Sequence, residues 1–314
     1  MPDVLVIGEA LVDIVSAPGR AAVEHVGGSP ANVALGLARL GIGTRLLTRI
    51  GDDDRGRLVR RHLEASGVRL VDGSVTSQPT STATAHLDPD GVASYEFELD
   101  WTLPAGCHPG DARAVHTGSI AAMLAPGGDD VLRLIEAVGG RALVSYDPNV
   151  RPALMGDPRT ALERIERIVR AADVVKVSDE DLAWLLPGTD PLQAVQDWLA
   201  NGPALVVLTK GGEGAVGVLA AGMVEVAAPK IVVADTVGAG DALMAGLLDG
   251  LDGAGLLAAD RVEDLRAAST DELASLLSHA VAIAALTCTR PGADPPTRED
   301  LENWEPVSAT SRAR

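Results

Sequence analysis

The chain of 314 residues has few aromatic side chains and few cysteines. Aromatic residues make up 2% of the sequence although 46% of it is hydrophobic, so the core must consist mainly of Ala, Val, Leu and Ile. The two cysteines, Cys107 and Cys288, lie far apart, which fits neither a CxxC zinc site nor a disulfide framework. We therefore expect a reducing compartment.

The sequence also lacks an excess of basic residues and any long hydrophobic run. Its 26 Lys and Arg face 44 Asp and Glu, and the net charge of −18 argues against nucleic-acid binding, which requires clustered cations. No stretch approaches the about 18 consecutive apolar residues of a membrane span. The opening MPDVLVIGEALVDI has no basic leader and is interrupted by Glu9 and Asp13. We expect a cytoplasmic protein with no nucleic-acid or membrane partner.

Short apolar runs bounded by turn residues alternate with longer helical patterns. The runs predict strands at 3–9, 44–51, 114–119, 142–149, 174–178 and 204–211. The patterns predict helices at 30–40, 54–66, 127–138, 158–171, 179–186, 191–200, 239–250 and 271–288. Continuous apolar strands separated by helices predict an α/β fold with a doubly wound, mainly parallel sheet flanked by helices.

Two segments depart from this rhythm and predict a small β-sheet lid. Residues 81–99 read as two strands joined by the turn Pro89-Asp90-Gly91, and residues 11–27 look extended. No linker or repeat is evident, so we expect one domain, 1–314, with the lid inserted in it. The stretch 251–270 is expected to be a surface loop or a frayed helix.

The segment DTVGAGDALMAGLL, residues 235–248, combines a glycine-rich turn with an apolar helix. We expect a strand, KIVVAD, to end at Asp235 and the helix to begin near Asp241. Small residues at 238–240 let backbone N–H groups converge on an anion at the helix N-terminus. The Lys of a Walker A loop is missing. Asp241 is either a helix cap or a general base that takes a proton from a hydroxyl attacking a γ-phosphate.

A second segment, GGSPANVALGLARLG, residues 27–41, has a Gly-Gly turn before an apolar helix. Asn32 lies in the first turn, where its amide suits a neutral hydroxyl ligand. The same residues are also simply a good helix start, because Pro30 falls near the first helical position.

Together these two segments closely resemble the signature segments of the ribokinase-like (PfkB) family of carbohydrate kinases. VIGEALVDI resembles the family's first strand and HTGSI its mid-sheet strand, while YDPNVRP and VKVSDEDL are similar to bacterial fructokinases and 2-keto-3-deoxygluconate kinases. The resemblance implies phosphorylation of a sugar hydroxyl by ATP with Mg²⁺, leaves a monovalent cation open, and implies a homodimer formed through the lid.

The resemblance also assigns roles to individual residues. It makes Asp241 the catalytic base, and it makes the anion hole from Gly238, Ala239 and Gly240. The positions that match sugar-binding residues are Asp13, Gly28, Asn32, Phe97 and Arg151. A solvent-exposed strand-end carboxylate is the alternative for Asp13, and a surface arginine is the alternative for Arg151.

The nucleotide and metal positions match less closely. The family binds Mg²⁺ through water with an NxxE motif. This chain has Ser178 and Asp181 at the two ends of that motif, so either Glu180 or Asp181 is expected to bind the metal-bound waters. The alternative is that these acids only favour a helix N-terminus. The resemblance assigns ATP binding to Ser178, Thr209, Gly211 and Gly214, with the helix 274–288 on the adenine side. Residues 212–217 also satisfy GxGxxG, but a β-hairpin around 220–222 is expected there instead of the helix that a dinucleotide oxidoreductase requires.

The acceptor is predicted from the lid. Residues 91–103 contain no Lys or Arg, and Leu99 falls where sugar-acid kinases usually carry an arginine. This favours a neutral sugar, fructose, beneath an apolar lid face formed by Tyr95, Phe97 and Trp101. Because Arg151 could bind a carboxylate, a sugar acid remains an alternative acceptor. The remaining alternatives are a ribokinase, a nucleoside kinase and a catalytically silent sugar-binding regulator.

Overall fold

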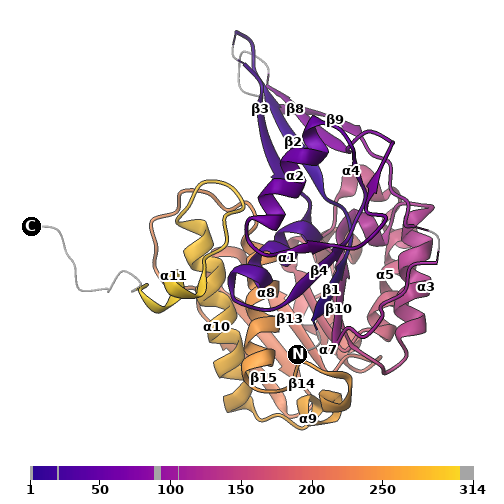
Figure 1. Ribbon diagram of the computed structural model, residues 1–314. Coiled ribbons are helices and arrows are strands. Elements are labelled where there is room, and N and C mark those ends of the chain that lie inside the picture. The colour runs from indigo at the N-terminus through magenta and orange to yellow at the C-terminus, as the bar shows by residue number, and fades with distance from the viewer. Residues whose placement is uncertain (1–2, 20, 88–92, 105, 305–314) are drawn as a thin grey trace, which may run out of the picture.

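A nine-stranded, mainly parallel sheet forms the centre of the protein (Figure 1). The computed structural model describes residues 3–19, 21–87, 93–104 and 106–304. The strand order is β15-β14-β13-β12-β11-β10-β1-β4-β6, and only β14 and β15 run antiparallel to their neighbours. The strands are β1 (Val4–Ile7), β4 (Thr44–Leu47), β6 (Arg69–Leu70), β10 (Ala114–Gly118), β11 (Leu143–Asp147), β12 (Val174–Ser178), β13 (Leu205–Thr209), β14 (Ala215–Leu219) and β15 (Gly222–Val226).

Helices cover both faces of this sheet, as the continuous apolar strands predict. One apolar cluster packs α1, α2, α8, α9 and α10 against one face, and the other packs α3, α5, α6 and α7 against the opposite face. The helices are α1 (Ser29–Arg39), α2 (Asp54–Glu64), α3 (Gly127–Val138), α4 (Pro152–Met155), α5 (Pro158–Ala171), α6 (Asp179–Leu185), α7 (Pro191–Leu199), α8 (Ala239–Gly253), α9 (Val262–Arg266), α10 (Thr270–Cys288) and α11 (Arg298–Glu302). This confirms the predicted fold class.

A second sheet of four strands projects from the main domain (Figure 1). Its order is β3-β2-β8-β9, so strands from the two predicted lid segments pair with each other. The turn Pro89-Asp90-Gly91 lies outside the described residues. The lid strands are β2 (Leu11–Ser16), β3 (Val23–Gly27), β8 (Thr82–Leu87) and β9 (Ala93–Glu98), and a separate pair is formed by β5 (Ile50–Gly51) and β7 (Val75–Thr76).

The expected strand KIVVAD, residues 230–235, was wrong. The chain is irregular there and Val232 is 80% exposed. Ala234 and Asp235 donate their backbone N–H groups to the carbonyl of Cys288 at the end of α10, not to a strand. The apolar side chains had suggested a buried strand, but the segment runs outside the sheet from β15 to α8. The hairpin before it, β14 and β15, was predicted correctly and rules out a helix at Gly217.

Residues 251–270 are more ordered than a surface loop. Helix α8 continues to Gly253, and α9 follows after a short 3₁₀ turn. Leu256, Leu257 and Leu265 are buried in the core cluster on this side of the sheet. Helix α10 is long and apolar enough to span a bilayer by length and composition, but it packs against α8, β14 and β15 as a core helix.

Candidate active site

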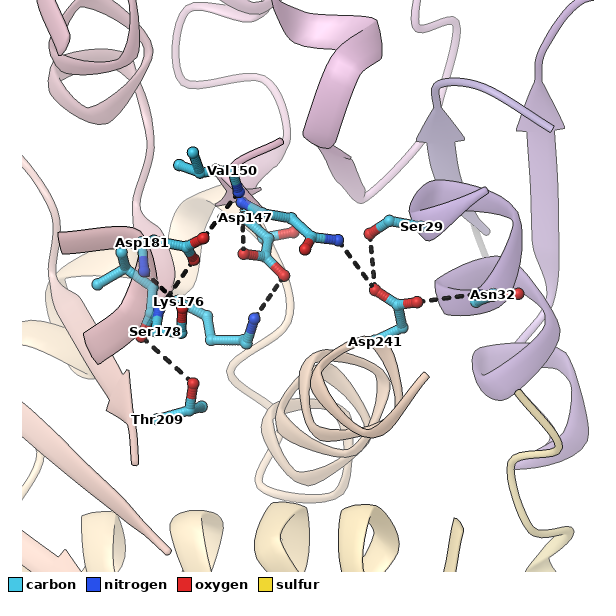
Figure 2. Close-up of polar contacts among 12 residues, drawn as sticks. Ser29, Asn32, Asp147, Val150, Lys176, Ser178, Asp181, Thr209 and Asp241 are labelled. Atoms are coloured by element: carbon cyan, nitrogen blue, oxygen red, sulfur yellow. Dashed lines mark hydrogen bonds and ion pairs between the residues drawn. The ribbon is translucent and has the colours of Figure 1, made fainter. Parts of the chain in front are cut away.

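The N-termini of α1 and α8 meet above the carboxyl ends of the parallel strands, where open α/β sheets bind ligands. Asp241, in the first turn of α8, is 7% exposed. Ser29 donates a hydrogen bond to its Oδ1 at 2.6 Å and Asn32 donates to its Oδ2 at 2.8 Å, both from the first turn of α1 (Figure 2). The Asp241 carboxylate therefore contacts another helix and does not cap its own.

A loop after β11 completes the surroundings of this carboxylate. The amide of Asn149 donates to Oδ1 of Asp241 at 3.5 Å, and its side-chain oxygen accepts from Arg151 at 2.6 Å. Asn149 has a φ of +39°, a left-handed conformation that asparagine tolerates better than most residues. Desolvation raises the pKa of Asp241 and of Asp13, and the charge of the exposed Arg151 opposes this rise.

Burial raises the pKa of Asp241 above its ordinary value. The hydrogen bonds from Ser29 and Asn32 and the positive charges of Lys176 and Arg151 act in the opposite direction. The carboxyl group is thus more basic than a surface aspartate, while four partners still stabilise its ionised form. This combination suits a group that must accept a proton.

Gly238, in the turn before α8, has no room for a side chain. Gly238 has a φ of +76°, and a Cβ there would lie 2.6 Å from the Cβ of Ala293. At Gly240, which follows Ala239, a Cβ would lie 3.3 Å from Nζ of Lys176. The N–H group of Ala239 donates to the carbonyl oxygen of Thr236 at 3.2 Å. The turn lies at the positive end of the α8 dipole, which suits an anion.

A buried ion pair lies beneath this turn. Nζ of Lys176, in β12, donates to Oδ2 of Asp147 at 2.6 Å, with side-chain exposures of 4% and 1% (Figure 2). Burial raises the pKa of Asp147. Burial alone would lower the pKa of Lys176, but the carboxylates of Asp147, Asp181 and Asp241 outweigh it and raise that pKa, so the lysine stays charged.

The predicted metal positions form a helix cap. Ser178 accepts the N–H of Asp181 at 3.0 Å, and Oδ2 of Asp181 accepts the N–H of Ser178 at 3.1 Å, a capping box at the start of α6. Oδ1 of Asp181 accepts the N–H of Val150 at 2.8 Å. Both oxygens of Asp181 thus have backbone partners, whereas Glu180 is exposed. Within the described part of the chain no three His, Cys, Asp or Glu residues cluster as direct metal ligands.

The predicted nucleotide segment follows β13. Thr209 pairs with Ser178 in the parallel register, so these residues lie side by side at the edge of the sheet. Gly211 has a φ of +51° and open space around its Cβ position. Gly214 has a φ of +108°, and a Cβ there would lie 2.0 Å from the carbonyl oxygen of Val226. The glycines make the turn from β13 into the hairpin.

On the lid, Asp13 and Phe97 lie on one face. Asp13 pairs with His25 on one side and with Ala83 on the other, and Ala83 pairs with Phe97. Directly paired residues point to the same face, so these four residues form one row across the sheet. Asp13 is exposed in the middle of β2 rather than at a strand end. A Cβ at Gly27 would lie 2.0 Å from its Oδ2, so that glycine makes room for the carboxylate.

The expected apolar lid face is smaller than predicted. Tyr95 and Phe97 stack with ring centroids 6.2 Å apart. Trp101 was wrongly assigned to this face: it is buried in the main domain and donates its indole N–H to the carbonyl of Ala121 at 2.8 Å. Strand β9 ends at Glu98, so the alternation that placed Trp101 with the other aromatic residues stops before it.

Another buried carboxyl group lies just after β1. Glu9 is 6% exposed and accepts the N–H of Ala121 at 3.1 Å. Burial raises its pKa to about 7. The backbone beside it is also close to the site, because Gly28, the N-cap of α1 with a φ of +104°, has no room for a Cβ against the Glu9 carbonyl oxygen, 2.5 Å away.

Comparison with known proteins identifies the family of this chain. The profile described as "pfkB family carbohydrate kinase" matches residues 1–300. The chain belongs to this family. A fructokinase of Rhizobium leguminosarum bv. trifolii is 35% identical to the kinase over 273 residues, 83% of each chain. A fructokinase of Klebsiella pneumoniae is 33% identical over 310 residues, 95% of this chain and 97% of the relative.

Solved structures agree with this assignment. Fructokinase from Xylella fastidiosa with bound ATP matches the kinase with a TM-score of 0.84 at 26% identity, covering 96% of this chain and 98% of that one. A double mutant of fructokinase from Vibrio cholerae, bound to fructose, ADP and a potassium ion, matches with a TM-score of 0.79 at 28% identity, covering 96% and 97%. The protein is an ATP-dependent carbohydrate kinase.

Sequence reasoning missed several residues of the kinase site. Ser29 and Asn149 hold Asp241, and Lys176 and Asp147 are charged groups buried near it. Glu9 is a further buried carboxyl group, after β1. The lysine and the aspartate carried a signal, since each is a charged residue in an apolar strand of the predicted sheet. Ser29 and Asn149 carried none, because their roles depend on contacts with a residue about 210 and 90 positions away in the chain.

Proposed function

We propose that this kinase transfers the γ-phosphoryl group of ATP to a hydroxyl group of fructose, with Asp241 as the general base. The observation that carries the proposal is the position of Asp241, buried between two helix N-termini beside a glycine turn that suits an anion. The names of the relatives and the absence of Lys and Arg from residues 91–103 support a neutral sugar, and fructose in particular.

In the proposed reaction Asp241 takes the proton of the attacking hydroxyl as its oxygen approaches the phosphorus. The N–H groups of Gly238, Ala239 and Gly240 stabilise the charge on the transferred phosphoryl group. Ser29 and Asn32 hold the Asp241 carboxylate toward the acceptor. This geometry gives Asn32 a role in orienting the base in addition to the sugar contact that its sequence position implies.

The proposed sugar site lies between the lid and the main domain. Asp13 accepts hydrogen bonds from sugar hydroxyls, and Phe97, in the same row of the lid, provides an apolar wall. Gly28 brings the backbone close to the sugar, and Arg151 faces its polar end or the transferred phosphate. Closure of the lid over these groups excludes water.

The nucleotide is proposed to bind along Ser178, Thr209, Gly211 and Gly214, at the carboxyl ends of β12 and β13. Mg²⁺ neutralises charge on the phosphates, and we propose that it is held through water with Glu180 the better candidate, because both oxygens of Asp181 already accept backbone N–H groups. The potassium ion bound to the Vibrio cholerae structure supports measuring activity with and without that cation.

We also propose a cytoplasmic homodimer formed through the lid. The row next to Asp13 consists of Val23, Val15, Ala85 and Tyr95, all apolar or aromatic. Helix α2 contacts β2 and β3. Tyr95, at the β9 end of this row, is 65% exposed. An exposed apolar row on a sheet is a site for association.

The base is tested with Asp241→Asn, which keeps shape but cannot accept the proton. We expect kcat to fall by about 10²–10⁴-fold, as for loss of a general base, with binding of ATP and sugar retained. Asp271→Asn, which replaces an exposed first-turn acid of α10, is the matched control and should be fully active. Near-normal turnover of Asp241→Asn would refute the assignment.

The acceptor is tested by coupled ADP release over fructose, ribose, 2-keto-3-deoxygluconate and nucleosides. We expect fructose to give the highest kcat/KM. Turnover of the sugar acid alone would refute fructose as the acceptor and would indicate that Arg151 binds the carboxylate of the acid. Turnover of a nucleoside alone would refute the sugar assignment. ATP binding with no ADP release from any acceptor would support a regulatory protein.

A further inference from the structure

Lys176 is the one lysine of the described central strands, and its side chain points toward α8. Along β12 it alternates with Val175 and Val177, which pack in the cluster on the opposite face of the sheet. Its ammonium group is bound by Asp147 at 2.6 Å at the end of the adjacent strand (Figure 2). A buried ion pair gives little net stability compared with apolar side chains of the same volume, so stability alone is a poor explanation for it.

The position of Lys176 relative to α8 is informative. A Cβ on Gly240 would lie 3.3 Å from Nζ, so the ammonium group lies directly beneath the first turn of the helix. Asp241 is the next residue, and its negative charge is one of those that raise the pKa of Lys176. The interaction is reciprocal, since Lys176 lowers the pKa of Asp241.

The charged groups around Asp241 are few. Helix α1 contributes the neutral groups of Ser29 and Asn32. The loop after β11 contributes Arg151, which is exposed, and the last residue of β11, Asp147, is bound to Lys176. From α6, Asp181 lies close enough to affect the ion pair. Solvent screens the charge of the exposed arginine, whereas the field of a buried ammonium group is screened much less.

We propose that Lys176 is a positioning residue of the kinase site: its buried ammonium group, held by Asp147 beneath the first turn of α8, keeps the Asp241 carboxylate ionised against the cost of its burial. The proposal rests on the proposed function of Asp241 as base. The two members of the ion pair then have different roles: Asp147 holds the lysine in place, and the lysine stabilises the ionised carboxylate of Asp241. The same charge also reinforces the positive potential of the glycine turn at 238–240.

The direction of the expected effect follows from the charge. A nearby cation favours the ionised carboxylate, so its removal raises the pKa of Asp241. Since a general base must be ionised to act, activity is then lost most at low pH. Disturbed packing, by contrast, lowers activity equally across the pH range.

The experiment measures kcat/KM for fructose and ATP from pH 5 to 9 in three variants. Lys176→Met removes the charge and keeps the aliphatic stem. Lys176→Met with Asp147→Asn removes both charges at nearly constant shape, which avoids an unpaired buried carboxylate and protects folding. Lys176→Arg retains the charge. Thermal unfolding identifies the variants that remain folded.

For Lys176→Met we expect the acidic limb of the profile to move upward by about one pH unit, as for loss of one nearby charge. The double variant also removes the negative charge of Asp147, so its limb should move upward by less. For a shift of one pH unit, kcat/KM falls about tenfold at pH values below the limb and changes little at pH values above it. Lys176→Arg should keep the limb of the native protein. An unmoved limb in the folded double variant, or a loss independent of pH, overturns the proposal.

Failure of this inference is distinguishable from failure of the proposed function. If Asp241→Asn retains normal turnover, Asp241 is not the base and the proposed function fails irrespective of Lys176. If Asp241→Asn is inactive but the limb of the double variant is unmoved, Asp241 remains the base and the role of Lys176 is refuted.

Discussion

Asp241 owes its chemical character to residues from other parts of the chain. Burial raises its pKa, whereas Ser29 and Asn32 from α1 and two cations lower it. None of these partners belongs to the helix that carries it. An aspartate in the first turn of a helix commonly does no more than interact favourably with the helix dipole. Here the carboxylate also accepts hydrogen bonds from α1, which that ordinary role does not require.

Glu9 predicts a pH-dependent stability at the residue scale. In the unfolded chain this carboxyl group ionises near 4.5, whereas burial raises its pKa to about 7 in the folded protein. The folded state therefore holds a proton that the unfolded state releases, and stability falls as the pH rises from about 4.5 to about 7. The loss attributable to Glu9 is about 3 kcal/mol, since one pKa unit is worth about 1.4 kcal/mol.

This prediction is checked by urea unfolding of the native protein and Glu9→Gln at pH 5 and pH 8. Glutamine can still accept the N–H of Ala121, so the variant should be more stable than the native protein at pH 8 and should lose less stability between the two values. Glu299→Gln, at an exposed position, is the control. Equal pH dependence for the native protein and Glu9→Gln would contradict the raised pKa.

At the scale of elements, the site is the junction of helix N-termini with strand carboxyl ends. Parallel strands end at one edge, which brings Asp147, Ser178 and Thr209 to the same side of the sheet. The N-terminus of α8 lies above them and meets that of α1. Positive helix ends and polar strand ends thus lie close together, an arrangement that suits a phosphorylated ligand.

The turn before α8 gives a second prediction. Gly238→Ala forces a left-handed conformation on alanine and pushes its Cβ against Ala293, so we expect a loss of about 1–3 kcal/mol in stability. We also expect kcat to fall at temperatures where the variant is folded, since the N–H groups of the turn move. Thermal unfolding and the ADP-release assay measure both effects.

Gly253→Ala is a matched control at the other end of the same helix. Nothing lies within 4 Å of a Cβ at Gly253, so alanine there should leave activity unchanged and raise stability by about 0.5–1 kcal/mol through its higher helix propensity. Equal effects of the two substitutions would mean that the turn tolerates a side chain and has no special geometry.

At the scale of the whole molecule, the proposed function makes the lid and the carboxyl ends of the central strands two sides of one site. Helix α2 packs against β2 and β3, so the opposite face of the lid carries Asp13 and Phe97. That face has one row with the proposed sugar-binding residues and a second, apolar row. The two rows explain how one small sheet serves both a substrate and a second subunit in the proposed dimer.

The dimer yields a prediction with an internal control. Tyr95→Asp places a charge in the apolar row, and we expect the mass in sedimentation equilibrium to change from dimer to monomer. Ser94→Asp adds the same charge to the adjacent residue, which is exposed on the opposite face of β9, and should leave the dimer intact. A monomeric native protein, or a Tyr95→Asp variant that remains dimeric, would refute association through this row.

Much of the fold was predictable because it depends on local patterns. Apolar strands and amphipathic helices were located to within a few residues. Of the two lid segments, 81–99 was recognised by its alternation and 11–27 by the lack of a helical period. Two errors share a cause. The segment 230–235 and Trp101 have side chains that suit a strand or a lid, but whether a strand finds a partner, and which apolar surface an aromatic ring covers, depends on the rest of the fold.

The sequence by itself determined the family, the fold class, the glycine turns and the identity of the proposed base, because these depend on residue types at short spacings. Only the tertiary structure decided what surrounds that base. Ser29, Asn149 and Lys176 come from three separate segments, and their contacts with the first turn of α8 exist only once the strands are ordered in the sheet. Charge interactions and hydrogen bonds depend on distances of a few ångströms in space, and these distances cannot be read from separations along the chain.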